Sequence, residues 1–121
     1  MGKTAANPLA EAMNRLWAKH FPQMEERVAT LRMAAESLAK GTLTEAEQQR
    51  AGADAHKLAG VLGTFGLKEG TELAREAEAL YESKLDGNAA AVPRLASIAQ
   101  QLQMMLTNRT QTAETPTAET A

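Results

Sequence analysis

The spacing of the apolar residues constrains this chain more than any other feature, because leucine, alanine and methionine recur every three or four positions along most of its length. Such a period is typical of helices that bury one face. Aromatic residues make up only 3% of the sequence, and the residues that dominate, such as Ala, Leu, Glu and Gln, are good helix formers. The sequence therefore predicts an all-α fold, and its 121 residues suit one domain.

Helix-start and helix-stop signals predict two helices in the first third of the chain. Asn7 followed by Pro8 forms a good N-cap and first helical position, which opens a short helix. Proline interrupts helices, so we expect this short helix to end before Pro22 and a second helix to begin there. Gly41 then ends the second helix.

Three further helices follow from similar signals. Residues 44–47 read Thr-Glu-Ala-Glu, a capping box that begins a third helix running toward Gly63 or Gly66. A fourth apolar stripe covers residues 67–85 and stops at an Asp-Gly-Asn turn signal. The last helix covers about 93–106, with its proline in or near the first turn.

The predicted linkers are only a few residues long, so consecutive helices should run antiparallel. We therefore predict an up-down-up-down four-helix bundle, with the extra short N-terminal helix packed across one end. The bundle is expected to occupy residues 1–106. Residues 107–121 are rich in Thr, Ala and Glu and nearly lack apolar bulk, so we expect a disordered tail or a truncated linker.

Charge and composition exclude several functional classes. The formal net charge of −2 and the pI of about 5.7 argue against nucleic-acid binding, which depends on a basic surface. Cysteine is absent, so thiolate metal sites and disulfides are excluded. No apolar run approaches the ~20 residues of a membrane helix, and no signal peptide is recognisable. We expect a cytoplasmic, monomeric protein with no membrane contact and no bound cofactor or metal.

One histidine in the third predicted helix lies in an unusual setting. A helix turns about 100° per residue, so His56 lies roughly 140° from the middle of the apolar stripe and faces outward. Small residues surround it on the same helix: Gly52, Ala59, Gly60 and Gly63. Each helical glycine costs roughly 0.8–1.0 kcal/mol relative to alanine, so the three together cost about 2–3 kcal/mol.

Two interpretations account for these glycines. Small neighbours would leave the imidazole of His56 accessible to another molecule. Alternatively, they would allow another helix to approach closely, as small residues do at tight crossings. Helical geometry alone leaves this choice open. Arg50, Lys57 and Lys68 fall along one flank of the same face, where their charges would favour an incoming anionic group.

The stretch from His56 to Leu67, His-Lys-Leu-Ala-Gly-Val-Leu-Gly-Thr-Phe-Gly-Leu, resembles the signature of histidine-phosphotransfer (Hpt) domains. It is most similar to the version with Gly-Thr-Phe-Gly after the histidine, which also occurs in the phosphorylatable domain of chemotaxis histidine kinases. Leu73, Ala74, Glu78 and Leu80 are similar to the next helix of the family. The resemblance extends over about residues 8–106. It departs from the family at Ala59, where a lysine is common.

The resemblance implies a phosphorelay carrier without autonomous catalysis. His56 would accept a phosphoryl group, with Arg50, Lys57 and Lys68 near the phosphate and the small residues forming the docking face. The partner would be a response-regulator receiver domain or a histidine kinase, and that partner would bring the Mg²⁺. A close variant is a domain that serves as the substrate of an attached or separate kinase.

A different class of function also fits the sequence. The chain could be a non-phosphorylated helical adaptor that docks a signalling partner through its glycine-rich face, and Ala59 in place of lysine favours this alternative. A coiled-coil oligomerisation module is the third alternative, but the glycines and short linkers argue against it.

Overall fold

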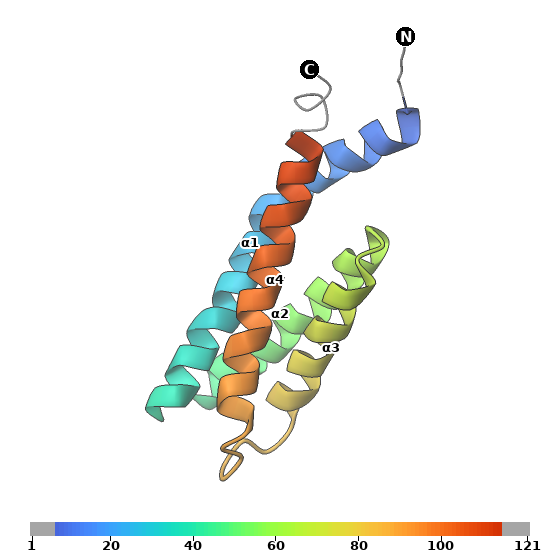
Figure 1. The fold of residues 1–121 in the computed structure, drawn as a ribbon. Coiled ribbons are helices and arrows are strands. Elements are labelled where there is room, and N and C mark those ends of the chain that lie inside the picture. Colours follow the sequence, from blue (N-terminus) through green and yellow to red (C-terminus); the bar gives the residue numbers. More distant parts are fainter. Residues whose placement is uncertain (1–6, 115–121) are drawn as a thin grey trace.

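The computed structural model describes residues 7–114, which form a bundle of four α-helices and contain no strand. The helices are α1 (Pro8–Lys40), α2 (Glu45–Thr64), α3 (Lys68–Glu82) and α4 (Ala91–Glu114). Helix α1 packs against α2 and α4, and α3 packs against the same two helices, so that the four enclose one core (Figure 1). This part of the chain has no helix long and apolar enough to cross a membrane.

Helix α1 corrects the prediction of a separate short N-terminal helix. It begins as expected, with Oδ1 of Asn7 accepting a hydrogen bond of 3.1 Å from the backbone N–H of Ala10. It does not break at Pro22, which lies inside one continuous helix of 33 residues. Trp17 and Met24 are both buried, so tertiary packing holds the helix on either side of the proline. Figure 1 shows that the first turns of α1 lean away from the direction of the rest.

The predicted start of α2 is confirmed. Oγ1 of Thr44 accepts from the N–H of Glu47 at 3.1 Å, and the Glu47 carboxylate accepts from the N–H of Thr44 at 2.9 Å. The helix ends at Thr64, and Gly66 follows in the left-handed region with φ 72°. Because that conformation is strained for residues with a Cβ, glycine is required for the tight turn into α3.

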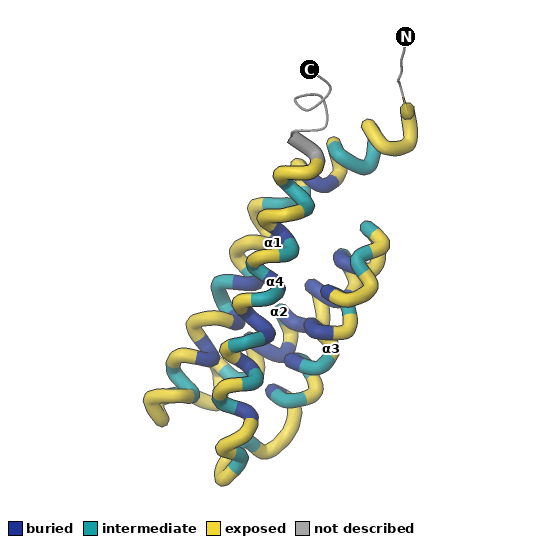
Figure 2. Tube along the Cα trace, in the orientation of Figure 1, coloured by how far each residue is buried: buried dark blue, intermediate teal, exposed yellow. Residues whose placement is uncertain are grey.

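The core is built from the apolar stripes of all four helices (Figure 2). Its largest fully buried side chains are Trp17, Met24, Val28, Leu31, Leu58, Leu62, Leu95, Ile98, Leu102 and Leu106. Tyr81 is also buried, and its hydroxyl has no hydrogen-bond partner within the described residues. Burial raises the pKa of Tyr81 to about 12, because the phenolate would lose its hydration.

Helix α4 corrects the predicted end of the folded domain. It continues to Glu114, so the prediction of a disordered tail is wrong for residues 107–114. The physical reason is that Thr110 follows Leu102 and Leu106 at four-residue spacing, on the stripe that faces the bundle, and is anchored there by Trp17. The rest of the predicted tail, residues 115–121, lies outside the described residues.

Helices α2 and α3 form a tightly packed hairpin whose register positions the candidate site. The turn between them is short and is closed by a hydrogen bond of 3.0 Å from the N–H of Leu67 to the carbonyl of Leu62. Contacts progress in opposite directions along the two helices: Gly52 lies against Tyr81, His56 against Glu78, and Gly63 against Thr71. Residues at equal distances along the chain from Leu67 therefore face one another.

Candidate functional site

His56 lies in the middle of α2 with 73% of its side chain exposed. The outward orientation predicted from the helical rotation is therefore confirmed. The opposite face of α2 carries Ala51, Ala55, Leu58 and Leu62, all of which are buried in the core. The histidine thus projects from a helix whose position is fixed by the bundle.

The imidazole of His56 is held by a carboxylate from the neighbouring helix. Nδ1 of His56 lies 2.8 Å from Oε2 of Glu78, and the Glu78 side chain is only 21% exposed. A carboxylate at this distance accepts a hydrogen bond, so it selects the form in which Nδ1 carries the proton. In the neutral ring the lone pair then lies on Nε2. The contact fixes both the orientation of the ring and the identity of its nucleophilic nitrogen.

The contact between Glu78 and His56 was not predicted from the sequence, where Glu78 appeared only as part of the resemblance to the next helix of the family. Glu78 is one of several glutamates on the predicted fourth helix, and such a run of acidic residues is typical of a helix face exposed to solvent. The available signal was the position of the turn, because His56 and Glu78 lie at equal distances along the chain from Leu67. In an antiparallel helical hairpin such residues face one another, but using this signal requires knowing where the turn is centred.

Two of the glycines near His56 leave open space on the surface. Gly60 is exposed, and a Cβ added to it would meet no atom within 4 Å. Gly63 is also exposed, and an added Cβ would lie 3.6 Å from Oγ1 of Thr71, which is ordinary contact. Helix packing does not require glycine at either position. These two positions therefore fit the interpretation that small neighbours leave the imidazole of His56 accessible to another molecule.

The other two small residues belong to the contact between α2 and α3, which corrects their assignment to an exposed docking face. Gly52 is buried, and an added Cβ would lie 3.6 Å from Cβ of Tyr81. Ala59 is only 5% exposed, and its carbonyl accepts a hydrogen bond of 3.3 Å from the Thr71 hydroxyl. Gly52 and Ala59 therefore lie in the contact between α2 and α3 and not on an open surface. An alanine at position 52 would make only ordinary contact, so close packing does not require a glycine there.

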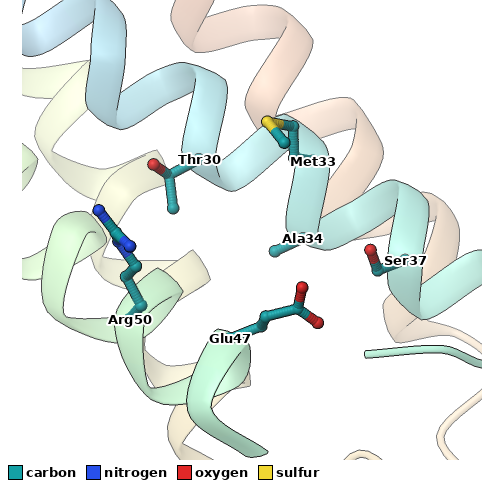
Figure 3. A pocket seen from close by; sticks show the side chains of 6 residues that line it. All are labelled: Thr30, Met33, Ala34, Ser37, Glu47 and Arg50. Atoms are coloured by element: carbon teal, nitrogen blue, oxygen red, sulfur yellow. The ribbon is translucent and has the colours of Figure 1, made fainter. Parts of the chain in front are cut away.

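The three predicted cations are not brought together around His56. Arg50 lines a shallow groove between α1 and α2 together with Thr30 and Met33 (Figure 3). That groove lies on the side of α2 that faces α1, whereas Glu78 approaches His56 from α3. The assignment of Arg50 to the phosphate-proximal group is therefore corrected, because a six-residue separation rotates it roughly 120° away from His56.

The two lysines also differ in their distance from the imidazole. Lys57 is exposed next to His56 in sequence, but it projects about 100° around the helix. Lys68 is the first residue of α3 and lines a hollow with Gly63 and Gly66. Gly63 lies roughly 10 Å along the α2 axis from His56. Lys68, which shares the hollow with Gly63, therefore lies near the turn of the hairpin and away from the imidazole.

The second histidine has a different environment. His20 is only half-exposed on α1, and its ring centroid lies 6.5 Å from that of Phe65 in the turn after α2. Among the described residues there is no group of three or more His, Cys, Asp or Glu side chains placed to hold a metal ion.

Comparison with known proteins gives two positive results. Residues 15–112 match the family described as the Hpt domain. The chain is 36% identical over 66 residues to Protein RcaC of Microchaete diplosiphon, an alignment that covers 54% of this chain and 10% of that protein. The chain therefore spans only about a tenth of the length of this curated relative. No solved structure gives a significant match.

Proposed function

We propose that this chain, which belongs to the Hpt domain family and has the role of a histidine-phosphotransfer carrier, holds the phosphoryl group on Nε2 of His56. The observation that supports this assignment is the 2.8 Å contact between Nδ1 of His56 and the Glu78 carboxylate. That contact leaves Nε2 as the nitrogen with a free lone pair, on a side chain that is 73% exposed. His20, the other histidine of the chain, is half-buried beside Phe65.

The transfer step balances with groups that this geometry supplies. The Nε2 lone pair of neutral His56 forms a bond to phosphorus while the bond from phosphorus to the donor oxygen breaks. The bonding electrons leave with the donor, which becomes a free carboxylate when the donor is a phosphoaspartate. The ring keeps its proton on Nδ1 and gains a positive charge, which the Glu78 carboxylate at 2.8 Å stabilises. Return transfer reverses these steps.

The partner of this carrier is a receiver domain with a phosphorylatable aspartate, a histidine kinase, or both. Hpt domains of two-component systems interact with these two classes of protein. We place the acidic pocket and the Mg²⁺ of the reaction on that partner, because phosphoryl transfer needs positioning and charge stabilisation more than covalent chemistry from the carrier. The carrier itself then needs no bound cofactor and no catalytic centre of its own.

Several finer features belong to the same proposal. We assign residues 63–66 to the Gly-Thr-Phe-Gly variant of the motif, in which the last glycine makes the left-handed turn and Phe65 packs edge-on against Trp17 at 5.1 Å. We also infer that the four helices alternate in direction around the bundle. The protein is proposed to act as a monomer in the cytoplasm.

One observation favours a second candidate, the non-phosphorylated adaptor. Ala59 replaces the common lysine of the family and is buried against α3, so it offers no cation to a phosphoryl group. In the adaptor, the surface opened by Gly60 and Gly63 would dock a signalling partner, and His56 would contribute only shape.

Phosphotransfer from a panel of radiolabelled phospho-receivers and a kinase tests the assignment. The wild type should gain acid-labile, base-stable label, and His56→Gln should gain none while keeping its helical circular dichroism. His20→Gln is the matched control and should be labelled like the wild type. Label that survives in His56→Gln would contradict the site. A folded wild type that no donor labels, together with partner binding that is unchanged in His56→Gln, would support the adaptor.

The same panel separates the two kinds of carrier. A relay carrier should exchange label reversibly with at least one receiver domain. A kinase-substrate domain should instead take its label from ATP through a kinase and pass it on in one direction.

A further inference from the structure

We propose that Arg75 of α3 supplies the cation that pairs with the phosphoryl group on His56. This inference rests on the proposed function and deepens it. A phosphoryl group on Nε2 carries two negative charges close to the Glu78 carboxylate, so a nearby cation would stabilise both the transfer and the phosphorylated state. The common lysine of the family is replaced by Ala59, which cannot serve this purpose.

The register of the hairpin places Arg75 next to the site. Gly63 faces Thr71 and His56 faces Glu78, so Arg75 lies opposite Ala59 and Gly60. Arg75 precedes Glu78 by three positions, which is roughly 4.5 Å along the α3 axis and keeps both side chains on the same face. Position 75 therefore lies across the helix contact from the place where a lysine at position 59 would begin.

The surface around Arg75 is open. The residue is exposed and lines a hollow whose other walls are Gly63, Gly66, Lys68, Thr71 and Glu72. No atom lies within 4 Å of the position that a Gly60 Cβ would take, so the long arginine side chain has room to move over Gly60 toward His56. Bulkier residues at these positions would block that path.

The guanidinium of Arg75 is also available for a new partner. The ion pairs formed among the described side chains are His56–Glu78 and Glu76–Arg94, and Arg75 takes part in neither. A guanidinium offers parallel N–H donors that match the oxygens of a phosphoryl group. Lys57 projects to another side of α2. Lys68 lines the same hollow as Arg75, but it begins seven positions earlier on α3, roughly 10 Å further along the axis from Glu78 and His56.

The test compares Arg75→Ala and Arg75→Lys with the matched controls Lys57→Ala and Lys68→Ala. The readouts are the maximal rate of transfer from a radiolabelled phospho-receiver, the hydrolysis rate of phospho-His56, and the ³¹P chemical shift of the phosphorylated protein. Arg75→Ala should lower the maximal rate about tenfold and shift the ³¹P resonance, because it removes one charged hydrogen bond to the phosphoryl group. Arg75→Lys should restore most of the rate, and the two controls should remain near the wild type.

The outcomes separate this inference from the proposed function. If His56 of the wild type accepts no label, the proposed function fails. If His56 is labelled and Arg75→Ala has wild-type kinetics and an unchanged ³¹P shift, only the role of Arg75 is overturned. A variant that weakens receiver binding without changing the maximal rate or the ³¹P shift would also overturn it, because the arginine would then act only in docking.

Discussion

The indole N–H of Trp17 donates a hydrogen bond of 2.9 Å to Oγ1 of Thr110, a residue 93 positions later in the chain. The same indole packs edge-on against Phe65 at 5.1 Å between ring centroids, and the Arg109 guanidinium lies 5.2 Å above it. Nη2 of Arg109 also donates to Oδ1 of Asn14 at 3.0 Å. One buried side chain therefore joins the start of α1, the end of α4 and the turn that follows α2.

We predict that Thr110→Val lowers the free energy of unfolding by about 1–3 kcal/mol, because the buried indole N–H of Trp17 loses its acceptor. Urea unfolding followed by circular dichroism measures this difference. Thr112→Val is the control, since Thr112 is exposed on the same helix, and it should change stability by no more than about 0.5 kcal/mol. Equal effects of the two substitutions would contradict the role of Thr110.

We predict that Glu78→Gln slows phosphoryl transfer to His56 about tenfold while the fold is retained. The neutral amide can still accept a hydrogen bond, but it does not offset the positive charge that develops on the ring. Transfer kinetics measure the rate, and ¹⁵N NMR of the imidazole reports which nitrogen carries the proton.

Glu82→Gln provides the control for this experiment. Glu82 is exposed one turn later on α3, so its substitution changes the charge of the region by the same amount without touching Nδ1 of His56. A rate lowered equally by both substitutions would indicate a general effect of charge and would refute a specific role for Glu78.

Two helical glycines should respond to alanine in opposite directions. Gly60→Ala should raise the free energy of unfolding by about 0.8–1.0 kcal/mol, because the new methyl group meets no atom and alanine favours the helix. Gly70→Ala should lower it, because a Cβ there would lie 3.1 Å from Cδ1 of Leu62 and 3.3 Å from Sδ of Met105, and Leu62 is fully buried in the core, where it has little room to move aside. Urea unfolding of the two variants measures both changes in the free energy of unfolding. Changes of the same sign would contradict the packing described around one of the two glycines.

The ion pair between Glu76 and Arg94 should make the free energy of unfolding depend on pH, in a direction that follows from the pKa of Glu76. Arg94 donates two hydrogen bonds of 2.6 Å to the Glu76 carboxylate, and this contact lowers the pKa of Glu76 below its ordinary value of 4.5. A lowered folded-state pKa means that the stabilisation is present above the unfolded-state pKa and is lost as pH falls through the folded one. Wild type should therefore be slightly more stable than Glu76→Gln at neutral pH, and the difference should vanish in acid well below pH 4.5.

Urea unfolding of both proteins at several pH values measures this difference. The effect should be small and should shrink with added salt, because both side chains are about two-fifths exposed to solvent. A difference that persists unchanged in strong acid would show that Glu76 acts through packing and not through its charge.

Local signals in the sequence were sufficient for much of α2. The capping box located its first residue, and the rotation of the helix placed His56 outward. The prediction of a break at Pro22 was wrong because burial of Trp17 and Met24 outweighs the lost backbone hydrogen bond. The contact of Glu78 with His56 was not predicted because the two residues are 22 positions apart, and their contact depends on the register of a hairpin instead of any local pattern.

The exposure of His56 on a single helix also determines the order of events in the proposed relay. Donor and acceptor must each bring a phosphorylation pocket over the same imidazole nitrogen, so they cannot occupy the carrier at the same time. Transfer should therefore follow ping-pong kinetics, in which the donor leaves before the acceptor binds. An excess of unphosphorylated donor would then inhibit delivery competitively, which would make throughput depend on the ratio of the two partners as well as on their affinities.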